Sequence, residues 1–189
     1  MTTRNTNARW GGVSIAFHWL VAALVLLVQI PAGLIMVRLD QGPAQNFFYD
    51  VHKMTGIIVF VLVGARLVWR WSNPVPALPA TMPRWQVVAA RANHALLYIF
   101  ILIMPISGFV YTAAGGFPVP LFYLYDLANL VPEHKAVADA AKAVHLTAIW
   151  GLVALVALHV AAAAYHGLVR RDGIFGRMVS PGAAGRSGA

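Results

Sequence analysis

The chain has 189 residues, of which 60% are hydrophobic and only 11% are charged, and its formal net charge is +8. Soluble domains carry about 25% charged residues, so this composition indicates a membrane protein and excludes an ordinary soluble enzyme. The sequence contains no cysteine, which excludes disulfides, iron–sulfur clusters, thiolate-ligated haem and covalently attached c-type haem. A metal site would therefore depend on His, Met or carboxylate ligands, and we expect no nucleic-acid partner.

Four apolar stretches follow one another along the chain, and each is predicted to be a membrane-spanning helix. They cover about residues 14–37, 52–71, 93–114 and 144–169. Each reaches the roughly 20 residues that a spanning helix needs. Pro31 and Pro105 lie inside the first and third stretches, where a kink is tolerated if neighbouring groups satisfy the freed carbonyl. We therefore expect an all-α membrane protein, a bundle of four transmembrane helices that forms one domain over residues 1–180.

The connections between these stretches differ in character. Residues 72–84 contain four prolines and are predicted to be extended and non-helical. The longest connection, residues 115–143, contains the apolar and aromatic run PVPLFYLYDLANL, which is predicted to lie on the membrane surface. The tail at residues 181–189 is rich in glycine and serine and is predicted to be disordered.

Basic residues are distributed unevenly across the predicted membrane. Ten arginines fall on the side that holds both termini, whereas four basic residues and five acidic residues fall on the other side. By the positive-inside rule, both termini are predicted to be cytoplasmic. The larger basic set is Arg4, Arg9, Arg66, Arg70, Arg84, Arg91, Arg170, Arg171, Arg177 and Arg186, and the smaller is Arg38, Lys53, Lys135 and Lys142.

Two histidines share one face of the fourth predicted helix. His145 and His159 are 14 residues apart, which corresponds to roughly 21 Å along a helix. Fourteen steps of about 100° return to within about 40° of the start, so both imidazoles face one side. One imidazole near each membrane surface suggests two stacked cofactors, which would let electrons cross the bilayer.

The predicted topology assigns each histidine a depth, and depth suggests partners. A haem bound by two histidines needs imidazoles at similar depth, which pairs His52 with His145 on the outer side. On the inner side His159 pairs with His18, or alternatively with His94. Ionisable residues inside spans are costly and mark functional sites by default, although each of these histidines, taken alone, is also compatible with a polar helix end that bonds water or headgroups. A zinc or copper site would need three or four converging ligands, and here the histidines divide between two depths.

Small residues near these histidines would leave space for a flat macrocycle. Gly56 lies one turn from His52 on the same face, Gly33 lies near the depth of the outer pair, and Gly151 lies between the two histidines of the fourth helix. The alternative is ordinary close packing of helices through small residues.

Basic residues near the histidines are candidates to bind haem propionates. Arg66 follows His52 by 14 residues, the spacing that also separates His145 from His159. Arg66 therefore lies on the same stripe at the inner depth, where it would form charge-assisted hydrogen bonds to a carboxylate. The alternative is an arginine that extends to the membrane surface. Lys53 and Lys142 are the corresponding candidates on the outer side.

Three histidines remain. His94 and His166 both lie near the inner boundary, where an imidazole would hydrogen-bond a quinone or relay its protons, or alternatively meet lipid headgroups. His166 follows His159 by 7 residues, about 20° away around the helix. His134 falls in a connection and is expected to be solvated.

These residues resemble a known family. FHW around His18, VHKMTG around His52, HALLYIFILIMPISG in the third stretch and VHLTAIWGLVALVALHVAAAAYH in the fourth are similar to the bacterial cytochrome b561 family. The resemblance covers about residues 10–180. It implies a four-helix inner-membrane protein with two b-type haems, ligated by His18 with His159 and by His52 with His145. The same architecture occurs in the cytochrome b subunits of formate dehydrogenases and nickel–iron hydrogenases.

The resemblance also implies an activity. Some stand-alone members oxidise superoxide at the outer surface and reduce ubiquinone, so membrane quinone and superoxide are the expected partners. We compare this hypothesis with two others, an electron conduit for a partner dehydrogenase, hydrogenase or soluble cytochrome, and a haem-free channel or small transporter. The outer segments carry four basic against five acidic residues, so no broad positive field is expected to attract an anion.

Overall fold

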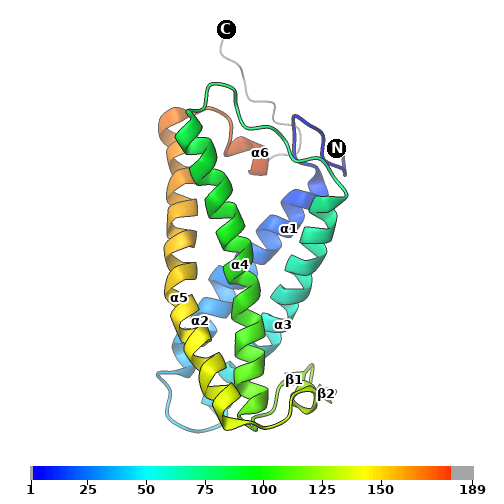
Figure 1. The fold of residues 1–189 in the computed structure, drawn as a ribbon, viewed down its shortest axis with the longest axis vertical. Helices are drawn as coiled ribbons and strands as arrows, with labels where there is room; N and C mark the ends of the chain where they lie inside the picture. Colours follow the sequence, from blue (N-terminus) through cyan, green and yellow to red (C-terminus); the bar gives the residue numbers. More distant parts are fainter. Residues whose placement is uncertain (1, 180–189) are drawn as a thin grey trace. The chain divides into compact units, whose positions relative to one another are not determined.

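Four long apolar helices make up most of residues 2–179, the part of the chain that the computed structural model describes (Figure 1). They cover Gly12–Met36, Pro43–Trp71, Arg84–Ala114 and Lys135–Arg170, with 25, 29, 31 and 36 residues. Each is longer than the roughly 20 residues that cross a bilayer. The predicted all-α membrane class is confirmed, and the predicted disordered tail lies outside the described residues.

The first span changes its helical geometry near Pro31. It consists of α1 (Gly12–Ala23), the π-helical segment η1 (Leu24–Gln29) and α2 (Ile30–Met36). The Ile30 N–H bonds the carbonyl of Val25, five residues back. Proline has no N–H and cannot continue the regular pattern, and a π-helical turn is one way to accommodate that break. The segment ends at Gln29, whose carbonyl belongs to the candidate site described below.

The other three spans begin nine residues before the apolar stretches predicted for them, at residues 43, 84 and 135. Hydropathy marks only the apolar part of a helix, whereas backbone hydrogen bonding continues into polar turns. In the first turns of the last span, Lys135 and Asp139 form an exposed i,i+4 ion pair of 2.7 Å. The helices concerned are α3 (Pro43–Trp71), α4 (Arg84–Ala114) and α5 (Lys135–Ala164), the last continued by the π-helical segment η3 (Tyr165–Arg170).

The chain divides into two compact units, and each of the four long helices contributes to both. In the described part, unit 1 contains residues 2–19, 64–98 and 153–179, and unit 2 contains residues 20–63 and 99–152. Seven histidines divide between them: His18, His94, His159 and His166 belong to unit 1, and His52, His134 and His145 belong to unit 2.

Unit 1 is closed by polar contacts among its connections. The buried Asn5 side chain accepts hydrogen bonds from the Gly11 N–H and from the Ser14 hydroxyl, and donates to the carbonyl of Pro74. The predicted non-helical connection is confirmed, since residues 72–83 form neither helix nor strand. The short helix α6 (Gly176–Val179) lies against α1, because the Trp19 indole N–H donates to the Met178 carbonyl at 2.6 Å.

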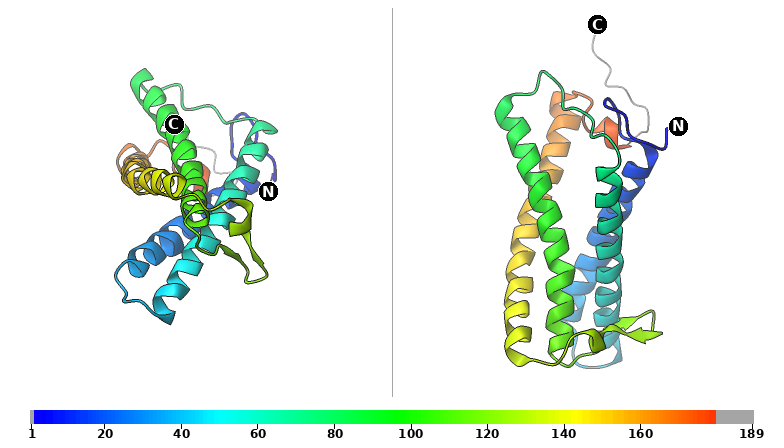
Figure 2. Two further views of the ribbon diagram at one scale, coloured as in Figure 1. Left: turned by 60° about the horizontal axis from the view of Figure 1, so that its bottom comes forward. Right: turned by 45° about the vertical axis from the view of Figure 1, so that its right-hand side comes forward.

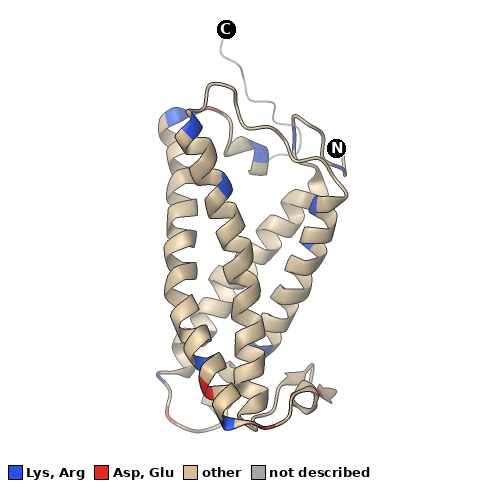
Figure 3. Ribbon diagram, viewed as in Figure 1, with Lys and Arg blue, Asp and Glu red and all other residues tan. Residues whose placement is uncertain are grey.

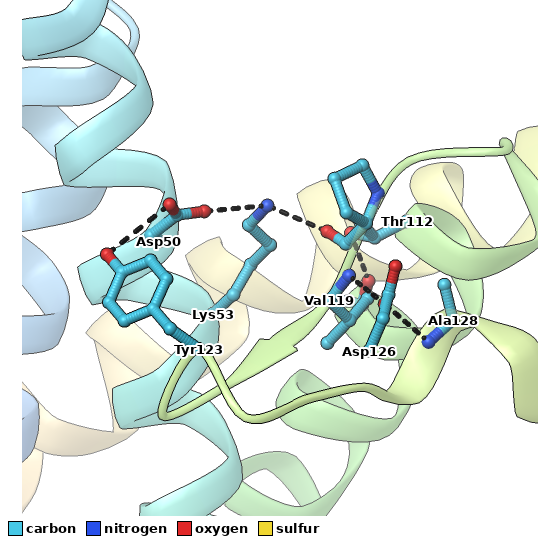
Figure 4. Close-up of polar contacts among 9 residues, drawn as sticks. Asp50, Lys53, Thr112, Val119, Tyr123, Asp126 and Ala128 are labelled. Atoms are coloured by element: carbon cyan, nitrogen blue, oxygen red, sulfur yellow. Dashed lines mark hydrogen bonds and ion pairs between the residues drawn. The ribbon is translucent and has the colours of Figure 1, made fainter.

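Unit 2 carries a β-hairpin between α4 and α5. Strands β1 (Pro120–Leu121) and β2 (Tyr125–Asp126) pair antiparallel, and a 3₁₀ turn, η2 (Leu127–Leu130), follows. The hairpin lies beside α3 (Figure 2), to which it is fixed by the Lys53 ammonium, 2.8 Å from the Pro118 carbonyl and 3.2 Å from the Asp50 carboxylate (Figure 4). The Asp126 carboxylate accepts hydrogen bonds from the Val119 and Ala128 N–H groups.

Charged residues occupy the helix ends and connections and leave the helix middles apolar (Figure 3). Of the ten arginines predicted to share one side, nine are described and all lie in unit 1, while Arg186 lies outside the described residues. Their only acidic companion in the described part of unit 1 is Asp172. Unit 2 contains the four remaining basic residues and five acidic ones.

The Asp126 carboxylate makes the hairpin sensitive to acid. Hydrogen bonds from the Ala128 and Val119 N–H groups hold the pKa of Asp126 below its usual value. A lowered folded-state pKa means that the stabilisation is complete above the unfolded-state pKa, about 3.9 for Asp, and is lost as the pH falls through the folded-state pKa. We predict that protection of the Val119 and Ala128 amides from hydrogen exchange is lost in this acid range. Asp126→Asn keeps an acceptor oxygen and should remove the pH dependence, and a variant with an unchanged profile would contradict the assignment.

Candidate functional site

In unit 2, the structure brings His52 of α3 and His145 of α5 together. Their ring centroids are 6.4 Å apart and the rings are nearly perpendicular, at 80°. Imidazole–metal bonds are about 2 Å long, so this separation suits one metal ion that takes a nitrogen from each ring. The two residues are the pair that depth predicted for the outer side.

His52 is oriented by the first span. Its Nδ1 lies 3.1 Å from the Gln29 carbonyl oxygen. A carbonyl only accepts, so Nδ1 carries the proton and Nε2 keeps its lone pair. The ring lies against Gly33, where an added Cβ would be 3.1 Å from the imidazole Cε1.

His145 is oriented in the same way by α4. Its Nδ1 lies 2.9 Å from the Met104 carbonyl oxygen and 3.2 Å from the Ser107 hydroxyl. An added Cβ on Gly108 would be 2.9 Å from the imidazole Cε1. Nδ1 therefore carries the proton here too, and Nε2 is again the nitrogen that keeps its lone pair.

The surroundings of the two imidazoles, which we call their seats, share one pattern. In each seat a main-chain carbonyl of a neighbouring helix accepts from Nδ1, and a glycine four residues later lies against the ring. Gln29 precedes Gly33 and Met104 precedes Gly108 by this interval, which places both groups on one helix face. Histidines that ligate metals typically donate their second ring N–H to a carbonyl or carboxylate, which sets the tautomer and the ring orientation. The residues of unit 2 therefore fit a haem that takes two imidazole ligands.

The side chain of Gln29 is a further component that sequence analysis missed. Its amide nitrogen lies 3.2 Å from His52 Nε2, and with Nδ1 protonated the amide donates to the Nε2 lone pair. Its amide oxygen is buried and has no hydrogen-bond partner among the described residues. Gly56 lies beside the same amide, since an added Cβ would be 3.3 Å from Gln29 Nε2. A metal bound to His52 Nε2 would require this amide to turn aside. The signal in the sequence was a lone amide residue inside an apolar stretch.

In unit 1, two imidazoles flank His159 of α5. The ring centroid of His18 is 6.0 Å from that of His159, and the centroid of His94 is 5.3 Å from it. Both inner partners considered from the sequence are therefore brought to His159. Within residues 2–179, no group of three or more His, Asp or Glu side chains is arranged to hold a metal ion.

Arg66 lies beside these imidazoles in unit 1. Its guanidinium donates to His18 Nδ1 across 3.4 Å and stands over the Tyr98 ring at 5.5 Å, while Arg70 stands over the same ring at 5.9 Å. Two guanidinium groups and a phenol therefore form one cationic cluster next to the imidazoles. Such a cluster is suited to binding a carboxylate. Tyr98 follows His94 by four residues and so lies on the same face of α4.

His166 has a partner that sequence analysis missed. Its Nδ1 lies 2.6 Å from the carboxylate of Asp172, and both side chains are largely buried. Arg170 lies 3.6 Å from the same carboxylate. The chain turns back here through Arg171, in the left-handed region with φ of 49°. That reversal, which brings Asp172 to the imidazole, left no periodic signal in the sequence.

Other predicted site residues have different surroundings. Lys53 contacts Asp50 and the hairpin, as described, and Lys142 stands over the Tyr111 ring at 5.7 Å. Gly151 lies against the Phe100 ring, so this glycine provides room for a side chain of α4. His134, the connecting histidine, accepts a hydrogen bond from the Val137 N–H at the start of α5.

Residues 9–181 match the family model of the prokaryotic cytochrome b561 proteins. The chain belongs to this family. It is 32% identical over 188 residues to "Cytochrome b561 homolog 2" of Escherichia coli strain K12, covering 95% of each chain. It is 27% identical over 176 residues to "Cytochrome b561 homolog 1" of the same organism, covering 90% of this chain and 97% of the relative.

Family membership establishes the coarse function. The protein is a membrane electron-transfer protein, and its family binds b-type haem. The four long apolar helices and the bacterial relatives indicate a multi-pass bacterial membrane protein. In this cytochrome, the imidazoles, carbonyls and glycines described above are the residues that fit such a group.

We predict that a methyl group on the seat glycines displaces the imidazoles. Gly108→Ala should lower the haem-to-protein ratio more than Gly33→Ala, because the added Cβ would lie 2.9 Å rather than 3.1 Å from the imidazole. Gly64→Ala, a helical glycine of α3 with no atom within 4 Å of its added Cβ, is the matched control. Haem absorbance per chain measures the effect. Equal haem content in all three variants would contradict the proposed seats.

Proposed function

We propose that this cytochrome binds two b-type haems and transfers electrons between a donor at the outer surface and the quinone pool. The single observation that carries the proposal is the pair of matched seats, in which His52 and His145 each donate Nδ1–H to a carbonyl, so that Nε2 is the nitrogen with a lone pair that could bind iron. The 14-residue spacing from His145 to His159 along α5 supports a second site in the same chain.

The inner haem is assigned to His159 and His18. His94 is the alternative partner, and its shorter centroid distance of 5.3 Å keeps it within reach. Support for His18 comes from its place in FHW and from the family resemblance. His94 would then stand beside the inner haem and be available to a quinone carbonyl or its protons.

Haem supplies one-electron chemistry, and the protein supplies what surrounds it. Imidazoles hold the iron, the apolar helices exclude water, and charged groups near the haem edge adjust its potential. We assign Arg66, with Arg70 and Tyr98, to the propionates of the inner haem. Lys53 and Lys142 are the corresponding candidates for the outer haem, and Gly56 gives the macrocycle access beside His52. For His52 Nε2 to hold iron, the Gln29 amide would have to turn aside.

Quinone reduction needs protons as well as electrons. His166, with Asp172 at 2.6 Å from Nδ1, is the second candidate to contact quinone or relay its protons, after His94. Because the carboxylate occupies Nδ1, Nε2 is the ring nitrogen left to contact a quinone. Both residues lie in unit 1, which contains nine of the described arginines. We therefore assign unit 1 and both termini to the cytoplasmic side of the inner membrane.

The most specific donor is superoxide, which the family resemblance suggests. Two superoxide anions would each lose one electron to give dioxygen, and ubiquinone would take two electrons and two protons to give ubiquinol. His52 with His145, and His159 with His18, would hold the groups that supply this one-electron chemistry.

A partner protein is the second candidate donor, and the lysines of unit 2 favour it. Lys53 is paired with Asp50, Lys135 with Asp139, and Lys142 stands over Tyr111. With four basic and five acidic residues in unit 2, little positive charge remains to attract an anion. A docked dehydrogenase or soluble cytochrome would not depend on such attraction.

The test is turnover of the purified cytochrome with superoxide and a soluble ubiquinone analogue. We predict ubiquinol formation that depends on superoxide and is lost in His145→Ala, since removing an outer ligand interrupts the path. His134→Ala, which removes the exposed connecting histidine of the same unit, should retain wild-type turnover.

The controls separate the two donors. Ubiquinol formation that is absent with superoxide but present with an artificial reductant would exclude superoxide as the donor and favour the conduit. A preparation without haem absorbance would contradict the electron-transfer proposal itself.

A further inference from the structure

The hairpin of unit 2 ends in an apolar tip that no part of its unit covers. Phe122, Tyr123, Leu124 and Tyr125 are between 60% and 77% exposed. Residues 117–125, FPVPLFYLY, contain no charged side chain. Exposed apolar patches of this kind mark contact with a membrane or a protein partner.

Hydrogen bonds fix the base of the hairpin, whereas the side chains of its tip are exposed. The Leu127 N–H bonds the Val119 carbonyl at 3.0 Å, Asp126 accepts from two N–H groups, and Lys53 ties Pro118 to α3 (Figure 4). The tip is therefore presented by a defined base and not by a loose connection. Among the described residues, the tip makes one side-chain hydrogen bond to α3, from the Tyr123 hydroxyl to Asp50 at 3.5 Å.

The residues at the turn are not those that the backbone prefers. Phe122 and Tyr123 have φ of 49° and 57°, a left-handed conformation that is an outlier for bulky side chains. Hairpin turns with two positive φ values favour Asn-Gly. Two aromatic residues at these positions disfavour the turn. Their side chains are therefore expected to serve a contact beyond the hairpin itself.

We propose that this tip, residues 122–125, inserts into the headgroup region of the bilayer that the helices cross. The connection leaves α4 at Ala114 and enters α5 at Lys135, so it begins and ends at one membrane boundary. The spans of unit 2 also expose large apolar side chains, such as those of Leu27 and Val61. Tyrosine and other aromatic residues are enriched at this depth, where an apolar ring meets lipid and a hydroxyl meets water.

A bilayer accounts for the tip better than a protein partner does. Stable protein interfaces use about 20–30 residues on each side, whereas residues 117–125 offer five large exposed side chains, those of the tip and Phe117. Interfacial insertion needs only a few apolar and aromatic side chains. Lys53, which binds the Pro118 carbonyl of the hairpin, follows His52 directly in α3. The hairpin that contacts lipid would therefore be bonded to the helix that carries an imidazole of the candidate site.

Site-directed spin labelling tests the proposal, since the chain has no cysteine of its own. Phe122→Cys and, as the matched control, Asn129→Cys at the polar base of the same connection each provide one attachment site. The labelled, haem-containing proteins are reconstituted in vesicles of phosphatidylethanolamine and phosphatidylglycerol. The accessibility of each label to oxygen and to a water-soluble nickel chelate is then measured. We expect the ratio of oxygen to chelate accessibility to be several-fold higher at 122 than at 129. Equal ratios, with both labels in water, would overturn the proposal and leave a protein partner as the occupant.

A second variant separates the role of the side chains from that of the turn. Phe122→Asn with Tyr123→Gly installs the preferred turn residues and removes both aromatic rings, and Leu124→Cys carries the label. We expect the label at 124 to be lipid-exposed in the otherwise unaltered chain and to move into water in this variant, with haem content unchanged. A label that stays in water in the unaltered chain, or stays in lipid in the variant, would overturn the proposal.

Discussion

The hydrogen bond from an imidazole Nδ1–H to a main-chain carbonyl on another helix is the interaction on which the candidate site of unit 2 depends. His52 makes it to Gln29 and His145 makes it to Met104. A buried donor without a partner costs about 1–3 kcal/mol, and hydrocarbon offers no water to replace it. The bond therefore holds each ring in one orientation and fixes which nitrogen keeps a lone pair. The glycine four residues beyond each carbonyl follows from this constraint, because a Cβ there would meet the ring.

Unit 1 surrounds its imidazoles differently. Among the described residues, His18 Nδ1 receives a hydrogen bond from Arg66 and makes none to a carbonyl, and His159 has two imidazole neighbours. Guanidinium groups, a phenol and the His166–Asp172 pair lie in the same unit. The imidazoles of unit 2 therefore have uncharged hydrogen-bond partners, whereas those of unit 1 lie among guanidinium groups. This difference is the one that the proposed function uses. The membrane contact proposed for the hairpin would fix the depth of unit 2 in the bilayer.

Much of this organisation was predictable from the sequence, because helical periodicity and span order determine which histidines share a depth. The juxtapositions of His52 with His145 and of His18 with His159 were predicted in this way, and the rings lie 6.4 and 6.0 Å apart. The carbonyls of Gln29 and Met104 and the fit at Gly108 were not predicted, since they depend on the rotation and spacing of helices, which hydropathy does not specify. Asp172 was missed because a reversal of the chain, not a helical repeat, brings it to His166. Gly151 was considered for cofactor space or for close helix packing, and it lies against Phe100.

The most direct test of two haems with the assigned ligands is the haem content per chain of four single variants. The purified protein is predicted to contain two b-type haems, and His145→Ala, His159→Ala and His18→Ala to contain one each. His94→Ala is predicted to keep both, with two low-spin signals in the electron paramagnetic resonance spectrum. Loss of a haem in His94→Ala but not in His18→Ala would contradict the inner pairing. A single haem in the unaltered protein would contradict the two-site account as a whole.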